Sequence, residues 1–363
     1  MTMDPPEGDQ RRHGFARERT HQPAGQKAAA PWGVAGDDVY AALDLGTNNC
    51  RLLVARPSRH GFRVIDAFSR IVRLGEGLGS EPRLRPAAME RTLDALKICR
   101  DKIGFRGVTR ARYVTTEACR AAANGEEFLA RVREETGLVL EVLDGREEAH
   151  LAAAGCSVLA DRDAEHVIIF DIGGGSTEMV WMRGGGGRLG GTRSRIADWA
   201  SLTIGVVTLA EQYDGATVTP ASFEAMVQAV AGKLDGFARV ARQAIDGANF
   251  HLLGTSGTVT TLAGIHLGLE RYDRRQVDGL WMDDHQVESV LGQLIGMSYD
   301  QRAAHGCIGH ERADLVLPGC AIFEAIRRAF PSRRVRIADR GLREGILVEL
   351  MAADRVWGRG GRS

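Results

Sequence analysis

The chain has 363 residues, which is long enough for two domains, and 44% hydrophobic and 26% charged residues, the composition of a soluble globular protein. Its formal net charge is zero, which excludes a bulk basic field that would attract a polyanion, so any phosphate site must be local. Six cysteines without a C-x-x-C pair predict buried free thiols in a reducing compartment.

The N-terminal segment, residues 1–37, is rich in Gly, Pro, Gln, Arg and Ala and has no apolar period, which predicts a disordered tail. It lacks the hydrophobic core of a signal peptide, and no run of about 18 apolar residues follows to cross a membrane. We therefore expect a cytoplasmic protein that does not contact membranes.

Three strand-like runs then follow closely, at 39–43, 50–55 and 62–73, and predict a meander. The turn between the first two contains Gly46, Thr47 and Asn48, directly after Asp44 and Leu45. Glycine lets backbone N–H groups come close to an anion, and small polar side chains add hydrogen bonds. An Asp at a strand end holds a hard cation such as Mg²⁺, or orders water around one.

The next elements alternate in type. Residues 86–103 have a helical apolar period, 112–115 and 138–143 are strand-like, and 147–159 is helical. Asn124, with Glu127 three residues later, predicts a capped helix start. Together with the meander, these elements predict one α/β lobe.

A second strand–turn unit repeats the first. Strands at 167–170 and 178–182 flank Asp171 and the turn residues Gly173, Gly174, Gly175, Ser176 and Thr177. Either turn alone is compatible with an ordinary tight turn. Two such units, each with its Asp, favour two similar lobes that close on one polyphosphate.

The rest of the second lobe contains one further candidate anion site. A strand at 251–253 leads to Gly254, Thr255, Ser256, Gly257 and Thr258, just before a helix that begins near Val259. Such a turn at a helix N-terminus binds anions readily, although a plain helix cap is the alternative. The remaining expected elements are a glycine-rich hairpin tip at 184–191, helices at 220–245, 284–299, 311–329 and 341–351, and a strand at 334–338.

Seven motifs in a fixed order carry a resemblance to a known family. They are Asp44-Leu45-Gly46-Thr47-Asn48 with Arg51, Thr116-Glu117-Ala118-Cys119-Arg120 with Asn124, Gly145-Arg146-Glu147-Glu148-Ala149, Asp171-Ile172-Gly173-Gly174-Gly175-Ser176-Thr177-Glu178, Gly254-Thr255-Ser256-Gly257-Thr258, Arg312-Ala313-Asp314 with Pro318-Gly319, and Asp339-Arg340-Gly341-Leu342-Arg343-Glu344-Gly345. Over about residues 38–353 the chain resembles the exopolyphosphatase and guanosine pentaphosphate phosphatase (Ppx/GppA) family, in its short, two-domain form.

This resemblance implies an α/β fold of two RNase H-like lobes, as in the actin, Hsp70 and sugar-kinase superfamily, with a cleft between them. We expect lobes at 38–160 and 161–353, a closing helix at 341–353 that packs on the first lobe, and a tail at 354–363. The implied enzyme is a Mg²⁺-dependent exopolyphosphatase that releases orthophosphate from inorganic polyphosphate. A homodimer and no nucleic-acid partner are also expected.

The resemblance also implies roles for single residues. Glu148 is the expected base that guides the attacking water, and Arg120 the expected cationic clamp on phosphate. Asp171, the Gly173 backbone and Glu178 match the family's metal and water ligands, and Asp44 would face them. The expected phosphate-binding residues are Gly46, Thr47, Asn48, Gly174, Gly175, Ser176 and Thr177, with Gly254 to Thr258 for a more distant phosphate or a nucleotide.

Three positions depart from the family pattern: Asn49, His150 and Ala338 stand where Ser, Arg and Ser are common. None removes a carboxylate that the chemistry needs, so they bear on substrate affinity rather than on reaction type. The open alternatives are a guanosine pentaphosphate 5′-phosphohydrolase, a non-catalytic protein that binds guanosine tetra- or pentaphosphate, and a phosphotransferase on the same fold.

Overall fold

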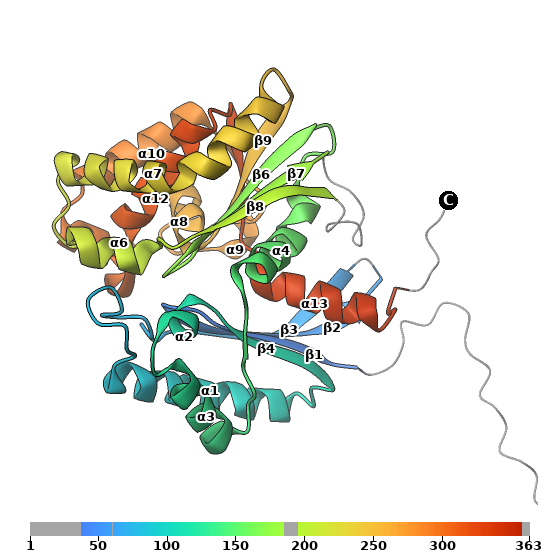
Figure 1. Ribbon diagram of the computed structural model, residues 1–363. Coiled ribbons are helices and arrows are strands. Elements are labelled where there is room, and N and C mark those ends of the chain that lie inside the picture. Colours follow the sequence, from blue (N-terminus) through green and yellow to red (C-terminus); the bar gives the residue numbers. More distant parts are fainter. Residues whose placement is uncertain (1–37, 60, 185–194, 358–363) are drawn as a thin grey trace, which may run out of the picture. The chain divides into compact units, whose positions relative to one another are not determined.

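The computed structural model describes residues 38–59, 61–184 and 195–357 (Figure 1). Chain contacts group Val34–Ser363 into one unit, which contains every described residue. The expected tail at 1–37, residues 358–363 of the expected tail at 354–363, and all of the expected hairpin tip except Gly184 lie outside the described residues.

The first sheet has five strands in the order β3-β2-β1-β4-β5. Its strands are β1 (Tyr40–Leu45), β2 (Asn49–Ser58), β3 (Gly61–Ile71), β4 (Arg110–Thr115) and β5 (Glu141–Val142). The first three form an antiparallel meander, and β4 and β5 continue parallel to β1. The strand expected at 138–143 is thus only two residues long, because Leu138 and Leu140 pack into the core beneath the sheet without ladder pairing.

Helices cover both faces of this sheet. Alternate residues of β1 point to opposite faces, so Leu43 packs toward α1 (Pro86–Phe105) and α3 (Gly125–Thr136), whereas Tyr40 and Ala42 pack on the other side. The short α2 (Glu117–Ala121) follows β4 directly.

Asn124 precedes α3 as predicted but does not cap it with its side chain. Its amide instead pairs with the backbone of Leu84, accepting from N at 2.8 Å and donating to O at 3.1 Å. Burial explains the difference, because a buried amide that satisfies both groups of Leu84 ties the loop before α1 to α3.

The second sheet repeats this order, β8-β7-β6-β9-β11, with β10 added at the edge. Its strands are β6 (His166–Ile172), β7 (Thr177–Arg183), β8 (Ile196–Leu202), β9 (Phe250–Thr255), β10 (Trp281–Asp283) and β11 (Arg334–Ala338). The β6-β7-β8 meander is antiparallel, and β9 and β11 are parallel to β6. Two copies of one strand order confirm the expected pair of RNase H-like sheets.

One face of the second sheet carries the largest core, shared with four helices (Figure 1). These are α7 (Pro220–Ile245), α8 (Gly257–His266), α10 (Asp284–Gly296) and α12 (Val316–Ala329). The shorter α6 (Val206–Tyr213), α9 (Arg274–Val277) and α11 (Tyr299–Ala304) lie in the connections. The helix expected at 311–329 begins only at Val316, because His310–Arg312 forms a separate 3-10 turn.

Two helices each pack on the sheet of the other lobe. The face of α4 (Gly145–Cys156) that carries Ala149, Ala153 and Cys156 packs against β6, β7 and β8 of the second sheet. In the other direction, α13 (Leu342–Ala353) packs against β1 and β2 of the first sheet. The two helices also touch each other, because a Cβ on Gly155 would lie 2.0 Å from Gly341 O and one on Gly345 2.0 Å from Leu151 O. The expected first lobe therefore includes a helix, α4, whose apolar face covers the second sheet.

Two predictions from composition can be compared with the structure. All six cysteines are buried free thiols, as expected. Among the described residues, no helix is long and apolar enough to cross a membrane.

Candidate active site

A cavity of about 680 Å³ is lined by residues from both sheets. Most of the predicted site residues line it: Asp44, Gly46, Thr47, Asn48, Glu148, Asp171, Gly173, Gly174, Gly175, Ser176, Glu178, Thr255, Ser256, Gly257 and Thr258. The carboxyl ends of β1 and β6 reach this one space, so the sequence-distant motifs meet.

Three predicted residues do not line the cavity. The Thr177 side chain is fully buried and donates to Ile204 O at 2.7 Å. Gly254 lies inside β9, where a Cβ would come within 2.4 Å of the Phe170 ring. Arg120, on α2, is not one of the residues that line the cavity.

The first turn is held by the segment that follows the meander. Thr47 O accepts a hydrogen bond from Gly75 N at 2.9 Å, and Asn48 O accepts from Val72 N at 2.9 Å and Arg73 N at 3.1 Å. Asn48 Oδ1 is buried and has no hydrogen-bond partner among the described residues. The turn is therefore held in place by backbone hydrogen bonds, and Asn48 Oδ1 is left available to accept a hydrogen bond from a ligand.

The second turn faces the first at very close range. A Cβ on Gly174 would lie 2.9 Å from Thr47 Cβ, and one on Gly175 would lie 2.8 Å from Thr47 Oγ1. Val206 N and Val207 N, at the start of α6, donate to Gly173 O and Gly174 O at 3.0 and 2.8 Å. The glycines are therefore required by the close approach of the two turns.

The two hairpins carry different charges at equivalent positions. In β1–β2, Asp44 lies directly opposite Arg51, whereas in β6–β7 Asp171 lies directly opposite Glu178. Like charges at directly opposed positions are destabilising unless something compensates them. The second hairpin is consequently the stronger candidate for a cation site.

Burial raises the pKa of four carboxyl groups that line the cavity, those of Asp44, Glu148, Asp171 and Glu178. The pKa of Asp171 rises to about 6 and that of Glu178 to about 8, with Asp171 adding to the shift of Glu178 through its charge. Ser201 Oγ donates to Glu178 Oε1 at 2.9 Å and opposes this rise. The pKa of Asp44 is also raised by burial, against the charge of Arg51.

Glu148 is near more acids than cations, since, besides burial, the charges of Glu178, Asp44 and Asp171 raise its pKa and that of Arg120 lowers it. It lies on the first turn of α4, whose N-terminus is capped by Asp144, and its Oε2 is buried without a hydrogen-bond partner among the described residues. Burial, then the charge of Glu178, raise its pKa well above the usual range. The nearest cation is Arg120, with Nη1 3.7 Å from that oxygen.

Arg120 is held away from Glu148 by other acceptors. Its guanidinium donates to Glu117 Oε2 through Nε, at 3.1 Å, and through Nη2, while Nη1 donates to Leu143 O. Arg120 thus stands beside the candidate base without forming a close ion pair with it.

The carboxylates fit a hydrated Mg²⁺ better than a closed metal cage. In the part of the chain that the structure describes, no three His, Cys, Asp or Glu side chains gather closely enough to hold a metal ion by themselves. Mg²⁺ characteristically binds through one or two carboxylates and keeps waters and substrate phosphate oxygens as its other ligands. Asp171 and Glu178 would supply that pair.

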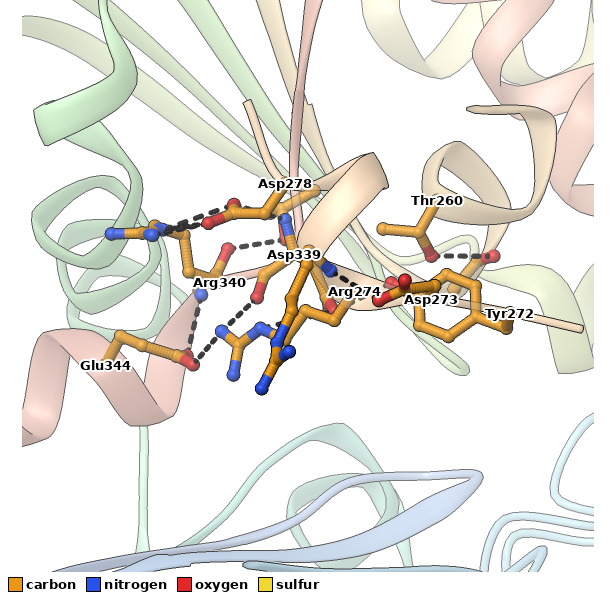
Figure 2. Close-up of polar contacts among 12 residues, drawn as sticks. Thr260, Tyr272, Asp273, Arg274, Asp278, Asp339, Arg340 and Glu344 are labelled. Carbon is orange, nitrogen blue, oxygen red and sulfur yellow. Dashed lines mark hydrogen bonds and ion pairs between the residues drawn. The ribbon is translucent and has the colours of Figure 1, made fainter. Parts of the chain in front are cut away.

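Sequence reasoning missed several polar residues of the cavity. Arg51, Arg312 and Arg343 line it, as do Asp339, Arg340 and Glu344. Figure 2 shows Arg274 between Asp339 and Glu344, and Arg340 against Asp278. All six residues stand in motifs that the sequence analysis singled out, and this membership could have indicated that they belong to the site.

Comparison with known proteins gives one family and a consistent set of relatives. The model of the Ppx/GppA phosphatase family matches residues 53–354. A guanosine-5′-triphosphate,3′-diphosphate pyrophosphatase of Aeromonas hydrophila is 30% identical over 315 residues, 86% of this chain, but the chain spans only 59% of that relative. Exopolyphosphatase 2 of Mycobacterium tuberculosis is 30% identical over 327 residues, 85% of this chain and 98% of the relative.

Solved structures share the fold. The Ppx/GppA family member of Aquifex aeolicus superposes with a TM-score of 0.70 at 28% identity, covering 87% of this chain and 98% of that one. An exopolyphosphatase of Cytophaga hutchinsonii gives a TM-score of 0.77 at 23% identity, covering 88% and 99%. The predicted family and the two-lobed α/β fold are confirmed.

Proposed function

The chain belongs to the Ppx/GppA phosphatase family, and on that premise we propose that it is a Mg²⁺-dependent exopolyphosphatase, which removes the terminal phosphate of inorganic polyphosphate. The observation that carries the proposal is Glu148: a buried carboxylate with an unpartnered oxygen, on the wall of a cavity lined by two glycine turns. The relative that the chain spans almost completely is itself named an exopolyphosphatase.

Hydrolysis of a phosphoanhydride needs a guided water, a held phosphate and neutralised charge. Glu148 supplies the acceptor for the water's proton, because its raised pKa makes it a stronger base than an exposed Glu. Its unpartnered oxygen would accept a hydrogen bond from that water.

The two facing turns would hold the reacting phosphate between them. Backbone N–H groups of the two turns would reach one ligand, because the turns themselves are in contact. Gly46 N and Gly173 N are not among them, since they donate to Asn49 O and Ser176 O at 2.9 Å. Arg120 would shift from Glu117 to a phosphate oxygen, for which a planar fork of donors is suited.

Bound Mg²⁺ would neutralise phosphate charge and polarise the reacting group. The residues that would hold it are Asp171 and Glu178, which lie directly opposite each other on β6 and β7, so that their ionised carboxylates would repel each other without a cation. Asp44 faces the same space from β1 and is partly balanced by Arg51.

A guanosine pentaphosphate 5′-phosphohydrolase is the second candidate, because a relative of that kind is equally similar over the matched residues. The two reactions share the same chemistry at the terminal phosphate and differ in what the rest of the substrate is.

A phosphate-release assay with Mg²⁺ tests the proposal, with short polyphosphate, long polyphosphate, guanosine pentaphosphate and ATP as parallel substrates. We expect the fastest release from polyphosphate. Faster release from guanosine pentaphosphate would favour the second candidate. Transfer of phosphate to ADP or acetate without free phosphate, or tight binding without release, would instead identify a phosphotransferase or a binding protein and overturn hydrolysis.

A further inference from the structure

The segment between β3 and α1, residues 72–85, is fastened to the first glycine turn. Gly75 N donates to Thr47 O at 2.9 Å, and Arg73 N donates to Asn48 O at 3.1 Å. A Cβ on Gly75 would lie only 2.2 Å from Thr47 Cγ2, so the segment and the turn are also in close packing contact. The segment therefore cannot shift without moving the turn.

The side chain of Arg73 leaves this segment and binds the second lobe. Its Nη1 and Nη2 donate to Asp314 Oδ2 and Oδ1 at 2.9 and 3.0 Å, and Nη2 also donates to Glu311 O at 2.9 Å. A bidentate guanidinium–carboxylate pair fixes a geometry as well as contributing attraction. Because Glu311 lines the cavity, this single side chain joins the first turn's segment to the opposite wall.

The backbone of Arg73 is strained. Its φ of 47° lies in the left-handed region, which is uncommon for a residue with a Cβ and which glycine adopts freely. Such an outlier persists where the surrounding contacts over-determine it. At this position the N–H holds Asn48 O and the guanidinium holds Asp314, so contacts to both lobes keep an arginine where glycine would be less strained.

The same segment makes a second contact with the other lobe. Gly77 N donates to Glu211 Oε1, on α6, at 2.6 Å. The start of α6 donates its own N–H groups to Gly173 O and Gly174 O of the second glycine turn. Hydrogen bonds through residues 73–77 and α6 thus connect the two turns outside the place where they touch.

We infer that Arg73 is a positioning residue, which acts with Asp314 to hold the first glycine turn against the second lobe so that both turns face one ligand. Arg73 itself is not one of the residues that line the cavity. Without the pair, the two lobes separate more often, and the apparent affinity for a ligand falls with the fraction of molecules that are closed. The effect on turnover rests on the proposed function, whereas the effect on lobe closure does not.

Steady-state phosphate release from tripolyphosphate with Mg²⁺ is the first test. Arg73→Met and Asp314→Asn should each raise KM by about 10-fold, the scale of a lost charged hydrogen bond, and change kcat by less than about 3-fold, because saturating substrate keeps the lobes closed. The double variant should be no worse than either single one, since the two side chains act as one pair. Arg73→Lys should recover part of the loss, because it keeps the charge without the bidentate geometry.

The matched control is Arg91→Met on α1. Arg91 binds the same segment, with Nε donating to Val72 O at 3.1 Å and Nη2 2.8 Å from Glu76 Oε2, but all of these partners belong to the first lobe. It is 43% exposed, close to the 36% of Arg73. A KM like that of the parent chain is expected. An equal rise of KM in Arg91→Met would reduce Arg73 to an ordinary stabilising residue and overturn the inference.

The second test measures lobe separation without turnover. Phe105→Cys on α1 and Val240→Cys on α7 supply exposed sites for nitroxide labels, and the six native thiols are buried. Double electron–electron resonance in EDTA should give a longer and broader distance distribution for Arg73→Met and Asp314→Asn than for the labelled parent chain. Tripolyphosphate should restore the parent distribution.

The two tests also separate this inference from the proposed function. Distances that depend on Arg73, in a chain that releases no phosphate from any substrate, would refute hydrolysis and keep the positioning role. Hydrolysis by the parent chain, with unchanged KM and unchanged distances in folded Arg73→Met and Asp314→Asn, would keep hydrolysis and refute the positioning role.

Discussion

The β1–β2 and β6–β7 hairpins have the same strand pairing but differ in the charge opposite the Asp. Each ends its first strand in an Asp, turns through glycine and returns, but the residue opposite the Asp is Arg51 in one and Glu178 in the other. The first hairpin thus pairs an acid with a base, whereas the second pairs two acids. Under the proposed function, one repeated structure would serve two tasks, an anion cradle in the first hairpin and a cation cradle in the second.

The largest expected effect concerns Glu148, the proposed base, which lies on neither hairpin. Glu148 is on α4, so Glu148→Gln should leave both cradles in place and lower turnover by about 10²–10⁴-fold, the usual contribution of a general base. Phosphate release measures this, and tripolyphosphate binding should survive.

The matched control is Glu147→Gln, one residue earlier on the same helix and paired with Arg112. Turnover close to that of the parent chain is expected there. Parent-like turnover in Glu148→Gln would remove Glu148 as the base.

The difference between the hairpins predicts unequal effects of two equivalent substitutions. Asp171→Asn should raise the Mg²⁺ concentration for half-maximal activity by about 10-fold or more, because it removes one of two expected metal ligands. Asp44→Asn should raise it less, since Arg51 already balances Asp44. Equal shifts in Mg²⁺ titrations of the two variants would break the proposed division of tasks.

The acid pair of the second hairpin should also make stability depend on pH. The pKa of Asp171 is raised from 3.8 to about 6 and that of Glu178 from 4.5 to about 8 in the folded chain. Stability from these groups is therefore fully present below the unfolded pKa values of 3.8 and 4.5, and it is lost as the pH rises from there to about 6 for Asp171 and about 8 for Glu178.

In EDTA, the melting temperature should fall between about pH 4 and about pH 8, and Mg²⁺ should reduce that fall by binding the ionised pair. Glu178→Gln is the comparison variant, and its melting temperature should depend less on both pH and Mg²⁺. A parent chain whose pH profile ignores Mg²⁺ would argue against a cation at this hairpin.

The smallest expected effect compares one threonine from each hairpin. Thr177→Val removes a buried hydrogen bond to Ile204 O and should cost about 1 kcal/mol of unfolding free energy with KM unchanged. Thr47→Val changes a cavity residue that touches the opposite turn and should raise KM. Denaturant unfolding and steady-state kinetics separate the two, and a raised KM in Thr177→Val would return Thr177 to the phosphate site.

The sequence predicted the paired hairpins because a buried strand, an Asp and a glycine turn are local features. Thr177 and Gly254 were wrongly expected to bind phosphate, because a motif names consecutive residues without regard to the direction of their side chains. Alternate residues of a strand face opposite sides of the sheet, so Thr177 faces Ile204 when Glu178 faces the cavity.

Other elements depended on tertiary contacts that no local pattern contains. The partly exposed β8 has no continuous apolar run, so its pairing with β7 was not predicted. Arg51, Arg312 and Arg343 stand in motifs that the sequence singled out, but no local pattern shows that they line one cavity, because they do so only after both sheets have formed.

The most direct test of the division between the hairpins is a crystal structure of the chain with Mn²⁺ in place of Mg²⁺ and an oligophosphate on Glu148→Gln, read by anomalous diffraction. The predicted result is a manganese peak beside the carboxylates of Asp171 and Glu178, with phosphate between the two glycine turns. A peak beside Asp44 and away from that pair, or phosphate bound outside this cavity, would contradict the account.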